Sequence, residues 1–183
     1  MLTQAEQFAA VFDRLGREVL AQLDSLPVSA LHWPLPLPQG DSLFTRALRL
    51  IEESAFWVLE VIGGQDVSHD QWSERSSGEA FADLALRYEQ WFIALHKMLS
   101  TLPDAMLDLF VEMPPSSQGL FDGGTMTVHA CLLHAVGQSA LNVGHIQLIC
   151  QLFADGERQL HEVATQHEVD EWLPEDMTSP LSR

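Results

Sequence analysis

Four polar side chains line one side of a segment that carries no formal charge. Residues 127–153 contain no Asp, Glu, Lys or Arg, and their apolar periodicity predicts a helix. At about 100° per residue, His134, Gln138 and His145 fall within about 40° of one another, and Asn142 lies within about 80° of His134. Imidazole and amide groups bind metal ions or hydrogen-bond partners, and buried polar groups need such partners. We therefore expect a facing helix to supply them.

Arg49 is the side chain that we expect to face this polar line. It lies inside the second predicted helix, beside apolar residues such as Leu48. A guanidinium offers five donors in a planar fork. We expect it to point between the helices, near the two amides of the line or near His145. The alternative is an exposed arginine that pairs with Glu52 or Glu53 at helical spacing.

The two cysteines show no sign of a disulfide or of nucleophilic chemistry. Cys131 and Cys150 lie on the same predicted helix, about 28 Å apart, which is far beyond disulfide reach. No cationic side chain accompanies them, so we expect protonated thiols. The sequence contains no Gly-x-Ser-x-Gly motif, phosphate-binding loop or Cys-x-x-Cys pair. We expect His129, His161 and His167 to be solvated.

The amino-acid composition limits which classes of molecule the protein is expected to bind. The 183 residues include 46% hydrophobic residues, 9 Lys and Arg, and 26 Asp and Glu, for a net charge of −17. This hydrophobic content is typical of a folded chain. Such an acidic surface repels nucleic acid and anionic membranes, so we expect neither partner. The first residues lack the pattern of a signal peptide, and unpaired cysteines favour a reducing, cytoplasmic setting.

Helical periodicity recurs in five segments, and no segment shows sustained alternation with a period of two. The pattern predicts an all-α fold, with a four-helix bundle over residues 1–154 and an acidic extension over 155–183 that packs partly on the bundle. The fourth helix is too apolar to be covered within one bundle, so we expect a homodimer. The predicted elements are a helix from Thr3 to Leu26, an extended run to Gly40, helices 41–63, 76–100 and 127–153, an irregular stretch 103–126 with a short helix at 106–110, and a helix at 157–172.

Several motifs carry a resemblance to a known family. Leu31-His32-Trp33-Pro34, Gln39-Gly40-Asp41-Ser42-Leu43 and Ala55-Phe56-Trp57-Val58-Leu59-Glu60 occur in that order, and residues 132–148 follow as LLHAVGQSALNVGHIQL. This series resembles the DinB/YfiT-like superfamily across most of residues 5–154. The resemblance implies a four-helix bundle that is commonly dimeric. In many members it implies one zinc or nickel ion held by three histidines.

The family's three ligand positions carry other residue types in this chain. One is Arg49, seven residues after Ser42, and the other two are Gln138 and Asn142. Zinc and nickel prefer imidazole or thiolate, and a guanidinium repels a cation. The resemblance therefore implies a metal-free pocket with no cofactor. Its neighbours would be His134, His145 and Trp57, with His134 bonded to a backbone group or a tryptophan. A rearranged zinc or nickel site using His134 or His145 is the alternative.

The expected function is that of a DinB-like protein with a degenerate site. It would bind a small, anionic ligand recognised by Arg49, or take part in a stress response. One alternative is a metal-dependent hydrolase or low-molecular-weight-thiol S-transferase with non-standard ligands. A second is a dimeric structural or interaction protein. Whether the chain is an enzyme stays open at this point.

Overall fold

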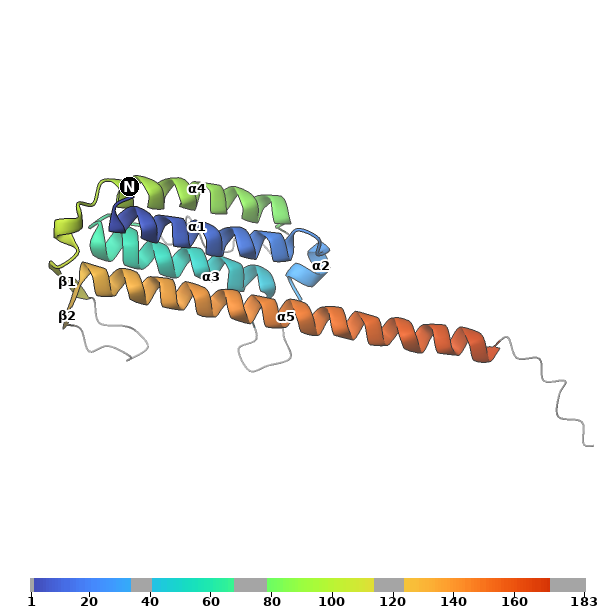
Figure 1. Cartoon of the computed structure of the whole chain (residues 1–183). Helices are drawn as coiled ribbons and strands as arrows, with labels where there is room; N and C mark the ends of the chain where they lie inside the picture. The colour runs from blue at the N-terminus through green and yellow to red at the C-terminus, as the bar shows by residue number, and fades with distance from the viewer. Residues whose placement is uncertain (1, 34–40, 68–78, 114–123, 172–183) are drawn as a thin grey trace, which may run out of the picture. The chain divides into compact units, whose positions relative to one another are not determined.

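The structure is a computed structural model that describes residues 2–33, 41–67, 79–113 and 124–171, with only the backbone over 157–171. The chain divides into two units, Met1–Gln147 and Leu148–Arg183. In the first unit, α1, α3, α4 and the first part of α5 lie side by side (Figure 1). The all-α prediction is confirmed, with one small hairpin in addition. The boundary predicted at 154/155 stays a prediction.

The helix α1 (Gln4–Leu23) begins with the predicted capping box. The backbone N–H of Thr3 donates to Glu6 Oε2 at 2.8 Å, and the N–H of Glu6 donates to Thr3 Oγ1 at 3.1 Å. Each side chain thus satisfies a backbone donor that the first helical turn leaves free. The predicted extended run begins instead with a one-turn helix, α2 (Val28–Leu31), because Pro27 suits the position before a first turn. Residues 34–40 lie outside the described chain.

The helix α3 (Leu43–Ala55) begins as predicted, with Ser42 Oγ accepting the backbone N–H of Thr45 at 3.1 Å. It continues as a π-helix, η1 (Phe56–Ile62), and ends at Gly63, also as predicted. A Cβ on Gly63 would lie 2.5 Å from the carbonyl oxygen of Leu59. Gly64 has a φ of 61°, in the left-handed region that glycine adopts without strain. These two glycines therefore end the helix.

The helix α4 (Phe81–Ser100) begins later than the predicted Ser76–Glu79 capping box. Its cap is Ala80, whose backbone N–H donates to Asp83 Oδ2 at 2.8 Å, and Ser76 lies outside the described residues. The buried hydroxyl of Tyr88 donates to the carbonyl oxygen of Ala47 at 2.9 Å, linking α4 to α3. The other buried side chains of α4 follow the predicted stripe: Leu84, Trp91, Phe92, Leu95 and Leu99.

The segment predicted to be irregular contains an antiparallel hairpin. A 3₁₀ turn, η3 (Asp104–Met106), is followed by β1 (Phe110–Met113), which pairs with β2 (Gly124–Thr127). The short helix predicted at 106–110 is therefore wrong. Four-residue strands are too short to produce a clear alternation in the sequence, so the pattern gave no signal for them.

The helix α5 (Val128–Glu171) is continuous where two separate helices were predicted. The sequence changes from uncharged to acidic near Asp155, and this change suggested a break that the backbone does not make. No described helix is both long and apolar enough to span a membrane. In the first unit, α5 buries one face and exposes another, so one chain does not cover it on all sides, and the homodimer predicted from its apolar surface stays a prediction. The buried residues of this part are Val128, Cys131, Leu132, Ala135, Ser139, Asn142, Val143 and Ile146.

The closest approach of α1 to α4 depends on a glycine. A Cβ added to Gly16 would lie 2.7 Å from Trp91 Cζ3 and 2.8 Å from Phe92 Cε1. The Trp91 ring is fully buried and makes an edge contact with Phe12, so it has no free space to move into. Gly16 therefore sets the spacing of these two helices.

Replacing Gly16 tests this contact. We expect Gly16→Ala to lower the free energy of unfolding by about 1–3 kcal/mol, because overpacking outweighs the better helix propensity of alanine. Urea denaturation measures the change. Arg14→Ala, on the exposed side of α1, is the control and should stay within about 0.5 kcal/mol of the parent. A Gly16→Ala variant that is more stable than the parent would show that the Trp91 and Phe92 rings can move to accommodate the methyl group without cost.

Candidate functional site

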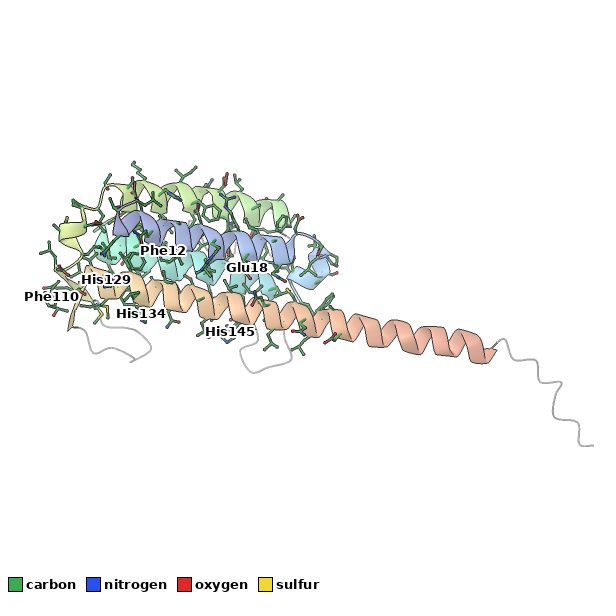
Figure 2. All side chains as sticks on the ribbon, in the orientation of Figure 1. Phe12, Glu18, Phe110, His129, His134 and His145 are labelled. Carbon is green, nitrogen blue, oxygen red and sulfur yellow. The ribbon has the colours of Figure 1, made fainter. Side chains whose placement is uncertain are left out.

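The polar line predicted on α5 does face α3. Arg46 Nη1 lies 3.4 Å from His145 Nδ1 at one end, and the Trp57 and His134 rings meet at 4.8 Å between centroids at the other. Along the polar line, the residue numbers rise on α3 while they fall on α5, so the two helices are antiparallel. Figure 2 shows His134 and His145 spaced along α5 within the first unit. The prediction of a facing helix that supplies partners is thus confirmed.

A direct hydrogen bond between the two helices joins Asn142 to Glu53. Asn142 is only 6% exposed, and its Nδ2 donates to Glu53 Oε2 at 2.7 Å. Burial raises the pKa of Glu53 above its ordinary value of 4.5, while the bond from Asn142 and the positive charge of Arg49 act in the opposite direction. A partly buried carboxylate is costly without such a partner. This bond therefore stabilises the contact of α3 with α5.

Two arginines converge on one carboxylate beside this link. Arg49 Nη1 lies 3.0 Å from Asp41 Oδ2, and Arg49 Nη2 donates to Asp41 Oδ1 at 3.1 Å. Arg46 Nε lies 3.6 Å from the same Oδ2 atom. The side chain of Arg49 is 46% exposed, whereas that of Asp41 is 15% exposed. Asp41 thus sits between the two guanidinium groups, with Arg49 toward solvent.

The predicted contact of Arg49 with Gln138, Asn142 or His145 is wrong. Long helical side chains lean toward the N-terminus of their helix, and there Arg49 meets Asp41. A charge-assisted bond to a carboxylate is about twice as strong as one to a neutral amide. The alternative, in which Arg49 pairs with Glu52 or Glu53, also differs from the observed pairing of Arg49 with Asp41.

The sequence analysis did not assign Arg46 or Glu53 to the contact with α5, and it named Glu53 only as a possible partner of Arg49. They lie seven residues apart, so both fall on the same face of α3, and both contact the polar line of α5. That spacing was visible in the sequence and could have identified them. Gln138 lies half-buried on the line between His134 and Asn142, and its role in a pocket stays a prediction.

Trp57 and His134 form an edge-to-face pair, and the predicted bond of His134 to a backbone group or a tryptophan stays a prediction. Burial lowers the pKa of His134 below its ordinary value, which favours the neutral imidazole. Trp57 belongs to η1, where the wider π-helical turn changes the direction of its side chain relative to an α-helix. Single π-helical turns occur often at functional sites.

The residues at this site do not fit a zinc or nickel ion. The three family positions carry one guanidinium and two amides, which are Arg49, Gln138 and Asn142. His134 and His145 are eleven residues apart, or about 16 Å along the helix, so one ion cannot bind both imidazoles. Within the described ranges, no three His, Cys, Asp or Glu residues gather as a metal site requires.

An open cavity of about 250 Å³ lies elsewhere in the first unit, between α1 and the beginning of α5. Figure 2 shows His129 near the hairpin end of α5, well along the helix from His145. His129 is exposed, as predicted, and its ring meets Phe8 edge-on at 5.7 Å. No pattern in the sequence indicated this cavity. Its lining residues are Gln4, Gln7, Phe8, Val11 and His129.

The cysteines are free, and burial raises the pKa of both thiols, as expected of protonated and unreactive groups. Cys131 lies in the first unit and Cys150 in the second. His161 and His167 fall where only the backbone is described, so their predicted exposure stays a prediction.

Comparison with known proteins identifies the architecture. No protein-family model matches the chain, and no curated protein matches it. Among solved structures, the chain is similar to a DinB-like protein from Bacillus cereus ATCC 10987. The two share 15% sequence identity and a TM-score of 0.60 over 81% of this chain and 92% of the other. At this identity the likeness concerns the fold alone, and the chain therefore has the DinB-like fold that its motifs resemble.

Proposed function

We propose that this DinB-like protein binds a small molecule without the help of a metal ion. The proposal rests mainly on one observation, the polar network between α3 and α5 at the place where the family resemblance implies metal ligands. Glu53 bonds to Asn142, and Arg46 contacts His145. This network ties the two helices together, which is a structural task that a shared metal ion performs when ligands come from both helices.

Arg49 supplies the group that recognises the ligand. Its guanidinium is half-exposed beside the network and is held in place by Asp41. A positioned guanidinium binds carboxylate and phosphate groups in a planar, two-bond geometry. This arrangement supports a small ligand with a negative charge. A role in stress response and a cytoplasmic location stay predictions.

The enzymatic alternative is a metal-dependent hydrolase or a low-molecular-weight-thiol S-transferase. Either would need zinc or nickel to polarise its substrate or activate a nucleophile. The donor residues at Arg49, Gln138 and Asn142 do not provide that site. The metal-free proposal is therefore the better supported of the two.

We also propose that two copies associate through the uncharged part of α5. Leu133 and Leu141 are 53% and 54% exposed on the side away from the core. Gly137 lies between these two leucines in the sequence, and Gly144 follows Leu141. A Cβ added to either glycine would meet nothing within 4 Å. Each glycine costs a helix about 1 kcal/mol, and close approach of a second backbone explains both. With a net charge of −17, two copies repel each other least where the surface is uncharged.

Metal content tests the first proposal. We expect protein purified without chelators to contain far less than one zinc or nickel ion per chain by elemental analysis, because the donor set repels a cation. Arg49→His combined with Gln138→His and Asn142→His is the matched variant and should raise the metal content toward one per chain. One zinc or nickel ion per unmodified chain would overturn the proposal.

The Glu53–Asn142 bond predicts unequal effects of two substitutions. Asn142→Ala leaves a partly buried carboxylate without its partner and should lower the free energy of unfolding by about 1–3 kcal/mol. Glu53→Gln keeps a carbonyl oxygen that accepts the same bond and removes the buried charge, so it should cost less than about 1 kcal/mol. Urea denaturation at neutral pH compares them. Equal losses in both variants would contradict a role for the bond.

The same pair predicts a pH dependence. Because burial raises the pKa of Glu53 in the folded state, that state holds the proton more tightly than the unfolded state does. The stabilising contribution is therefore present at low pH and is lost as the pH rises from about 4.5 through the folded pKa. Arg46 and Arg49 oppose the shift, and Glu52 adds to it. Glu53→Gln should flatten this part of the stability profile, and an unchanged profile would show that Glu53 does not cause it.

Sedimentation equilibrium tests the dimer. We expect a mass near twice 20.4 kDa at micromolar concentration. Leu141→Glu should weaken association at least about tenfold, because it places a charge in an apolar contact. Leu86→Glu, at a position on α4 that is 60% exposed, is the control and should leave association unchanged. A mass of 20.4 kDa for the unmodified chain would contradict the proposal.

A further inference from the structure

The ion pairs around Asp41 have the geometry of a bound carboxylate. Both oxygens of Asp41 face the two Nη atoms of Arg49, at 3.0 and 3.1 Å. The contact from Nη2 to Oδ1 is a hydrogen bond, and the contact of Nη1 with Oδ2 is an ion pair, so one guanidinium contacts both oxygens of the carboxylate. Asp41 lies just before the cap residue Ser42, so its carboxylate comes from outside the helix that carries both arginines. The carboxylate is therefore held as a ligand would be held.

Arg46 is incompletely satisfied by this arrangement. Its Nε atom is buried, and no hydrogen-bond acceptor meets it among the described residues. Asp41 Oδ2 lies 3.6 Å away, beyond hydrogen-bond distance, and has no hydrogen-bond partner in the described part of the chain either. Asp41 thus accepts a hydrogen bond from Arg49 through Oδ1, whereas its Oδ2 and the Nε of Arg46 form none with the described residues.

The other carboxylate near the two arginines is already engaged. Glu53 lies close enough for both positive charges to act on its pKa, but its Oε2 accepts the bond from Asn142. In the described ranges, Asp41 is the carboxylate within ion-pair distance of either guanidinium. The exposed side of Arg49 gives solvent direct access to the pair.

We propose that Arg46 and Arg49 form a binding site for the carboxylate group of a small organic acid, and that Asp41 occupies this site until such a ligand displaces it. The incoming carboxylate bonds to the fork of Arg49 and approaches Nε of Arg46 more closely than Asp41 does. Asp41 then moves out to solvent, so binding exchanges one carboxylate for another. The proposal extends the proposed function by naming the ligand class, and it rests on the ligand-binding part of that function.

A titration of the full ¹⁵N-labelled chain with acetate tests the exchange. The side-chain N–H signals of Arg46 and Arg49 are followed by NMR, with chloride balancing the ionic strength. We expect Asp41→Asn to bind acetate at least about tenfold more tightly than the parent, because the internal competitor is gone. Arg49→Gln should lose the response. Arg14→Gln, at an exposed position on α1, is the control and should behave as the parent does.

Three results would overturn the proposal. The first is an Asp41→Asn variant that binds acetate no better than the parent. The second is tighter binding of inorganic phosphate than of acetate, which would assign the site to another ligand class. If Asp41→Asn fails to fold, Arg49→Lys replaces it, because lysine keeps the charge and loses the fork. Unchanged acetate binding by Arg49→Lys is the third. Metal content by elemental analysis does not depend on acetate binding. A failure of the carboxylate-site proposal can therefore be told apart from a failure of the metal-free proposal.

Discussion

The need to satisfy polar side chains between α3 and α5 constrains the rest of this structure. Asn142 is buried in the part of α5 that carries no charged residue, and it forms its bond with Glu53 on the facing helix. That bond, with the Arg46–His145 contact and the Trp57–His134 ring pair, fixes which residues of the two helices lie opposite each other. Because buried polar groups must find partners, other registers of α3 against α5 are disfavoured.

The same network determines what the site can do. Asn142, at one of the implied metal-ligand positions, bonds to the carboxylate of Glu53, and the guanidinium of Arg46 contacts His145. Arg49 takes no part in the contact between the two helices and pairs with Asp41 at its solvent-exposed edge. In the function that we propose, such a site recognises charge and shape in a ligand and does not activate a metal-bound water. The dimer that we propose would form through the apolar and uncharged outer face of α5 in the first unit.

Much of the fold followed from local signals in the sequence, and the partners across the helix contact did not. The Thr3–Glu6 box, the Ser42 cap and the end at Gly63 depend on a few adjacent residues, so their chemistry was visible directly. The polar line on α5 was visible too, because helical spacing is regular. The identity of its partners depends on the lean of long side chains and on competition from Asp41, which no local pattern contains. The hairpin was missed because its strands are short.

A double-mutant cycle on Glu53 and Asn142 tests the central claim most directly. The free energies of unfolding of the parent, Glu53→Ala, Asn142→Ala and the double variant are measured by urea denaturation at neutral pH. If this bond ties α3 to α5, the two residues should show a coupling energy of about 0.5–3 kcal/mol. Strictly additive losses would mean that the bond contributes nothing to the fold, and would contradict the account given for the site.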